Sequence, residues 1–70
     1  MKEGDQITFS GCYTVYNPRL DKTKIEMNVI LRVGIITKIE KESIEVFSND
    51  EFCNLLKDDP SCTILCISSL

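Results

Sequence analysis

The chain has no histidine, tryptophan or alanine, and its three glycines stand apart at positions 4, 11 and 34. Without histidine the commonest general base of enzymes is missing, and isolated glycines do not make a phosphate-binding loop. The adjacent carboxylates Asp58 and Asp59 precede Pro60, a position typical of a solvated helix end. We therefore expect a protein that is not an enzyme and that holds no metal ion and no cofactor.

Neither sign of charge dominates, because 8 basic and 11 acidic residues give a net charge of −3. The basic residues are scattered, whereas a nucleic-acid-binding protein normally shows a basic patch. No stretch approaches the roughly 20 apolar residues of a membrane span, and the polar start MKEGDQ is unlike a secretory signal. We expect a single domain of residues 1–70 in the cytoplasm, with neither nucleic acid nor membrane as a partner.

Residues with GC-rich codons are scarce, since alanine is absent and glycine, proline and arginine are few. This composition indicates coding from an AT-rich genome, such as that of a low-GC bacterium or one of its phages. For a phage-encoded protein, the expected compartment is the cytoplasm of the host cell.

The four cysteines, at positions 12, 53, 62 and 66, do not match the spacing of a structural zinc site. Such sites pair their ligands two to four residues apart, and only the last two cysteines do so, within a predicted strand. A disulfide framework would require an oxidising compartment. We expect small buried apolar residues here, with zinc and disulfides as the alternatives.

The clearest pattern is an alternation over residues 25–39, where every odd position except Thr37 is apolar. A period of two predicts an extended ribbon with one buried face. Such a ribbon would extend roughly 50 Å, too long for a 70-residue domain with a radius of gyration of about 11 Å. It must therefore bend, and Gly34 is the predicted corner. Residues 6–16 also alternate, with Gly11 as a predicted bulge or bend.

A hairpin is predicted next, with Ile39 opposite Ile44 and a four-residue loop at 40–43. The ladder would continue with Lys38 opposite Glu45, Thr37 opposite Val46 and Ile36 opposite Phe47.

A short α-helix is predicted at about residues 49–58. Ser48 and Glu51 match a capping box, and Phe47 and Phe52 stand at the two positions of a hydrophobic staple. Asp59-Pro60 would end this helix. Residues 62–67 then form the last strand, apolar on both faces.

These elements predict a mainly β fold, either a small five-stranded bent barrel or a curled antiparallel sheet with one short helix before the last strand. The opening Lys2-Glu3-Gly4-Asp5 before a strand, and residues 34–39 before a hairpin, resemble the SH3-like small barrels over most of the chain. That resemblance implies peptide recognition in an aromatic-lined groove, for which this chain offers Tyr13 and Tyr16. The alternative is an open sheet of four or five strands with the helix on one face.

Four candidate binding residues lie around the first predicted loop, namely Tyr13, Tyr16, Arg19 and Leu20. Tyrosine and arginine are enriched at the energetic centres of interfaces. We therefore expect a small binding protein acting through protein–protein contacts, such as a phage-encoded or accessory inhibitor or regulator of an unknown protein partner.

An alternative function is an oligomeric sequestering protein that binds a small molecule or nucleotide at a subunit junction. Arg19, Lys24 and Arg32 would then contact phosphate groups. Homo-oligomerisation is expected in either case, through the strand at 62–67 or through an outer patch of Ile30, Ile36 and Phe47.

Overall fold

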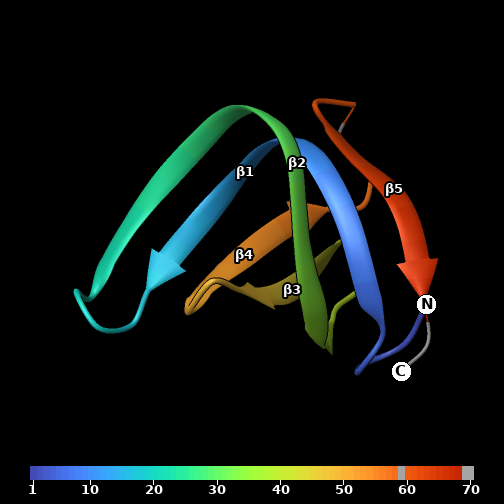
Figure 1. The fold of residues 1–70 in the computed structure, drawn as a ribbon, viewed down its shortest axis with the longest axis horizontal. Coiled ribbons are helices and arrows are strands. Elements are labelled where there is room, and N and C mark those ends of the chain that lie inside the picture. The colour runs from blue at the N-terminus through green and yellow to red at the C-terminus, as the bar shows by residue number, and fades with distance from the viewer. Residues whose placement is uncertain (59, 69–70) are drawn as a thin grey trace.

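The computed structural model describes residues 1–58 and 60–68, and of residues 28–30 and 65–68 it describes the backbone. The five strands are β1 (Gln6–Asn17), β2 (Lys22–Ile39), β3 (Ser43–Ser48), β4 (Glu51–Leu56) and β5 (Cys62–Ser68). All pair antiparallel in the order β2-β3-β4-β1-β5, and a further pairing of β1 with β2 closes a small barrel (Figure 1). The predicted mainly β fold is confirmed, as is a strand over residues 62–67.

β1 supplies the centre of the core through its odd positions. Ile7, Phe9, Tyr13 and Val15 are buried, and Phe9 packs edge to face on Tyr13 with ring centroids 5.1 Å apart. The later strands complete the core with Ile36, Ile44, Val46, Cys53 and Leu55. The alternation over residues 6–16 therefore predicted both the strand and its buried face correctly.

β2 is extended as predicted, but the face predicted to be buried is exposed. Ile25, Met27 and Leu31 are 71%, 67% and 59% exposed, and Val33 is 46% exposed. Gly34 and Ile36 at even positions turn inward instead, and both are buried. The expected outer patch with Phe47 is therefore wrong for Ile36, and the side chain of Ile30 lies outside the described residues.

The register of β1 and β2 explains this inversion. Asn17 lies opposite Lys22 across a four-residue turn, so each odd residue of β1 faces an even residue of β2. Because β1 places its odd side chains in the core, β2 must place its even side chains there. Between Glu26 and Arg32, β2 holds two more residues than the stretch of β1 opposite. Because two is an even number, odd residues of β1 face even residues of β2 on both sides of this region, as Tyr13 faces Glu26 and Phe9 faces Arg32.

The bend of β2 falls at these two irregularities and not at Gly34, the predicted corner. Gly34 lies in regular pairing opposite Ile7. Extra residues bend a strand, and β2 arches where it passes Gly11, whose φ is +107° (Figure 1). The prediction of a bulge or bend at Gly11 is therefore confirmed.

The hairpin of β2 and β3 begins as predicted and then shifts by one residue. Ile39 lies opposite Ile44 and Lys38 opposite Glu45, but the next pairs are Ile36 with Val46 and Ile35 with Phe47. The ladder positions predicted for Thr37 and Ile36 are therefore wrong. The shift buries Ile36 and Val46 together in the core, while Thr37 Oγ1 donates a hydrogen bond to Glu45 Oε2 at 2.8 Å.

The helix predicted at about residues 49–58 is wrong, because this segment forms the second strand of a hairpin. Asn49 and Asp50 make a two-residue turn with φ of 51° and 63°, as in a type I′ turn. Asn and Asp tolerate these left-handed angles better than most residues. The predicted capping pair Ser48 and Glu51 face each other across the hairpin.

Within residues 1–58 and 60–68, no helix is long and apolar enough to cross a membrane.

Candidate functional site

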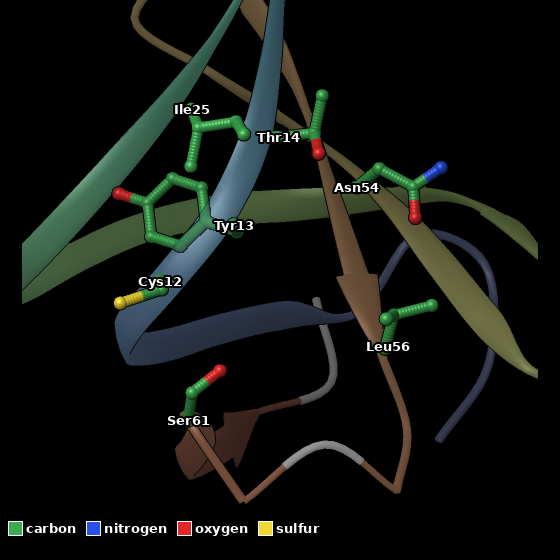
Figure 2. Close-up of a pocket in the computed structure, with 7 residues that line it drawn as sticks. All are labelled: Cys12, Tyr13, Thr14, Ile25, Asn54, Leu56 and Ser61. Atoms are coloured by element: carbon green, nitrogen blue, oxygen red, sulfur yellow. The ribbon is translucent and has the colours of Figure 1, made fainter.

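Two hollows adjoin on the outer surface of β1 and β4. The first, of ≈ 380 Å³, is lined by Cys12, Tyr13, Thr14, Ile25, Asn54, Leu56 and Ser61 (Figure 2). The second, of ≈ 370 Å³, is lined by Thr14, Tyr16, Glu45, Phe52, Cys53 and Asn54. Thr14 and Asn54 lie opposite each other in the sheet and border both hollows. Each volume is within the range of natural ligand pockets.

The strand topology creates the first hollow. β1 pairs with β5 as far as Gly11 and with β4 from Thr14 onward, so a gap opens between these two partners. Cys12 bridges this gap, because its backbone N–H donates to the carbonyl of Ser61 at 2.9 Å. The hollow is therefore set by backbone pairing rather than by flexible side chains.

The chemistry of the two hollows is neutral. Leu56 and Ile25 supply exposed apolar surface, and the exposed Thr14 hydroxyl and Asn54 amide supply hydrogen-bond donors and acceptors between them (Figure 2). Glu45 is the one charged residue among those that line either hollow. This surface suits a partner segment that is itself uncharged.

Aromatic side chains form a row beside the second hollow. Tyr16 on β1 lies opposite Phe52 on β4, which in turn lies opposite Phe47 on β3. The rings of Phe47 and Phe52 meet edge to face with centroids 5.1 Å apart. Tyr16 and Phe47 are each 38% exposed. We call these three residues the aromatic row.

The β1–β2 loop is held by its own hydrogen bonds. Asn17 Oδ1 accepts from the backbone N–H of Arg19 at 2.9 Å and of Leu20 at 3.3 Å. The Tyr16 hydroxyl donates to Asp21 Oδ1 at 2.8 Å, and this bond to a carboxylate raises the pKa of Tyr16. The loop thereby presents Leu20, which is 64% exposed, together with Arg19.

Arg32 occupies a very different environment inside the barrel. Its Nε donates to Ser48 Oγ at 3.0 Å, and its Nη2 donates to the Ser48 carbonyl at 2.9 Å and to Glu51 Oε1 at 3.0 Å. Ser48 Oγ donates onward to the Val33 carbonyl at 2.6 Å. The guanidinium also lies 5.9 Å from the ring centroid of Tyr13, a cation–π distance. Arg32 therefore ties β2 to the β3–β4 hairpin.

The six residues predicted as a binding site divide into three groups. Tyr16, Arg19 and Leu20 come together at the exposed loop, whereas Tyr13 and Arg32 are internal. Lys24 is exposed and pairs with Glu26 at 2.9 Å, which raises the pKa of Lys24. Each of the three basic residues of the expected phosphate site is paired with a carboxylate, Arg19 with Asp50, Lys24 with Glu26 and Arg32 with Glu51.

Sequence reasoning missed the residues on β4 that border the hollows, which are Phe52, Asn54 and Leu56. All three lie within the range of the predicted helix, about residues 49–58. In the strand, Cys53 and Leu55 turn inward while Leu56 is 53% exposed. This segment has no period of two, since its apolar residues stand at positions 52, 53, 55 and 56. The signal that could have found the strand is Asn49-Asp50, a pair that tolerates the left-handed angles of a two-residue turn.

The described cysteines differ in how deeply their side chains are buried. Cys53 is fully buried in the core, as predicted, and burial raises the pKa of its thiol to about 11. Cys12 is half-buried and carries a free thiol, and Cys62 is half-buried. The side chain of Cys66 lies outside the described residues. Among the described residues, no group of three metal-ligating side chains is close enough to hold an ion.

The raised pKa of Cys53 predicts a loss of stability at alkaline pH. The folded state holds the thiol proton more tightly than the unfolded chain does, so this contribution is complete below pH 9 and is lost as the pH rises from 9 to about 11. The free energy of unfolding should fall by about 3 kcal/mol over that interval. Urea denaturation at successive pH values measures it. Cys53→Ala should show a shallower slope, and an equal slope in both proteins would contradict the prediction.

Comparisons of the chain with family models, curated proteins and solved structures give no match. The function is therefore argued from the geometry of the surface itself.

Proposed function

We propose that the protein is a non-enzymatic binding protein that acts through protein–protein contact. The binding face consists of the two hollows, the aromatic row and the loop residues Arg19 and Leu20. The observation that carries the proposal is the arrangement of the two hollows beside the aromatic row, on a surface whose lining residues include one charge, Glu45.

Residue type and rigidity support this proposal. Tyrosine and arginine dominate the energetics of protein interfaces, and apolar anchors bind best in preformed pockets. Here the hollows are built on paired strands, so little ordering is needed when a partner binds. Thr14 and Asn54 can exchange hydrogen bonds with the backbone of an extended segment that crosses both hollows.

The placement of ionisable groups supports a binding role over a catalytic one. The Cys12 thiol lines the first hollow and the Glu45 carboxylate lines the second, so the residues that line the hollow of Cys12 include no carboxylate base. Cys53 borders the second hollow, but burial raises the pKa of its thiol to about 11, which keeps it protonated.

We also propose the kind of partner and the way in which it binds. An accessory or phage-encoded inhibitor of one cytoplasmic bacterial protein agrees with the small size and the AT-rich coding. An SH3-like barrel that binds a peptide segment across its aromatic side chains is the structural form that we propose for this activity.

The test uses Asn54→Arg, which places a charge at the boundary of the two hollows. The tagged protein should retain one stoichiometric partner from a lysate of a low-GC bacterium, and Asn54→Arg should retain at least about tenfold less. Thr63→Arg adds the same charge at an exposed position on β5 and should behave as the wild type. Equal retention by both variants, or no stoichiometric partner, would overturn the proposal.

A further inference from the structure

The arch of β2 presents a second exposed apolar surface. Met27, Leu31 and Val33 point outward from it, 67%, 59% and 46% exposed. We call these three residues the crest. Ile25 continues the line and also borders the first hollow, so it is the residue that joins the crest to the binding face.

The crest is free of charge, although β2 carries many charged residues. All of these occupy even positions, namely Lys22, Lys24, Glu26, Arg32 and Lys38. Glu26 and Arg32, the two nearest the crest, face inward opposite Tyr13 and Phe9, whereas Lys24 and Lys38 are exposed. The cross-strand neighbour of Val33 is Thr8, which is also uncharged. Exposed apolar side chains whose nearest charged neighbours along the strand, Glu26 and Arg32, face inward indicate that the crest is covered in the functional state.

We infer that a second copy of this chain covers the crest, packed about a twofold axis near the middle of β2. An interface between identical copies must be complementary to itself. A chain with a net charge of −3 repels its own copy wherever its charges meet. The crest avoids this repulsion because it is neutral.

The apolar positions 25, 27, 31 and 33 are also spaced symmetrically along β2 about position 29. With the axis at position 29, Met27 of one copy meets Leu31 of the other, and Ile25 meets Val33. In each contact two side chains of similar or different length meet, so the side chains of one copy can pack between those of the other. Since β2 bends between Glu26 and Arg32, the contact is centred on Met27 and Leu31.

The available area predicts a weak dimer. The crest and Ile25 together expose on the order of 400 Å² on each copy, or about 800 Å² in all, below the 1,200–2,000 Å² of stable interfaces. The dimer should therefore form with a dissociation constant in the micromolar to millimolar range. A second source of stability favours it, because a chain of this size buries only about 60% of its unfolded surface by itself.

Sedimentation equilibrium from about 10 µM to about 1 mM, the range of weak association, tests this inference. The wild type should shift from monomer to dimer over this range. Leu31→Arg and Met27→Glu should each weaken association at least about tenfold, with unchanged circular dichroism. An equimolar mixture of the two variants should recover dimers, because the axis brings Arg at position 31 beside Glu at position 27.

Three results would overturn the inference: a strictly monomeric wild type at the highest concentration, a dimer insensitive to both variants, or no recovery in the mixture. Asn54→Arg is the matched control and should dimerise as the wild type does. Because Asn54 belongs to the binding face and Leu31 to the crest, the dimer and the proposed partner binding can fail separately.

Discussion

Gly11→Ala should cause the largest loss of stability, lowering the free energy of unfolding by about 3 kcal/mol or more. Gly11 has a φ of +107°, where a residue with a side chain is strained. A Cβ atom at this position would lie 1.9 Å from the carbonyl oxygen of Ser61, which is backbone and cannot swing aside. That carbonyl accepts the hydrogen bond from Cys12, so moving it disrupts the link between β1 and the start of β5.

Magnitudes decide the outcome of this substitution. A domain of this size has a free energy of unfolding of about 4–10 kcal/mol. Strained dihedral angles and overpacking together cost about 3 kcal/mol or more. Far-ultraviolet circular dichroism and amide chemical-shift dispersion will show whether the sheet persists.

Gly4→Ala is the matched control for Gly11→Ala. Gly4 also has a positive φ, +93°, but a Cβ there meets nothing within 4 Å. It should therefore remain folded, with a loss of about 1–2 kcal/mol from backbone strain alone. Equal stability of the two variants would contradict the steric argument.

Arg32→Ala should produce the second largest loss, about 3 kcal/mol of unfolding free energy. The side chains of Arg32 and Glu51 are only 11% and 17% exposed. Removing the guanidinium leaves a shielded carboxylate without its cation, and Ser48, which is 3% exposed, loses two of its hydrogen-bond donors. Urea denaturation at neutral pH measures the difference.

Two further variants locate the cause of the Arg32 effect. Arg32→Ala with Glu51→Gln should lose less than the sum of the single variants, because the ion pair is shared. Arg19→Ala removes the partner of Asp50 in an exposed pair at 4.0 Å, with side chains 79% and 69% exposed, and should leave the denaturation midpoint unchanged. Strict additivity in the first case would show that the pair does not act as a unit.

The candidate site shows how far local patterns extend. The loop residues Tyr16, Arg19 and Leu20 were found because they lie within five positions of each other in sequence. The sequence alone did not predict that Asn54 lies beside Thr14, because they are forty positions apart and only the β1–β4 ladder makes them neighbours. Arg32 was expected at the surface, yet the β3–β4 turn places Ser48 and Glu51 around its guanidinium.

The β3–β4 hairpin shows why one segment admitted two interpretations. The spacing of Ser48 and Glu51 serves a helix cap or a two-residue turn equally well, since in both structures these residues approach each other. The left-handed angles at Asn49 and Asp50 select the turn. Pairing of β4 with β1 then places Cys53 and Leu55 in the core, which a helix in this place would not achieve.

By itself, the amino-acid sequence determined that this chain is built of strands, because a period of two in side-chain polarity is a local property of extended backbone. It also determined where β1 lies and which of its residues enter the core. Only the tertiary structure decided which face of β2 meets water. That choice depends on the register across the β1–β2 turn, and a shift of one residue there exchanges the two faces of the strand.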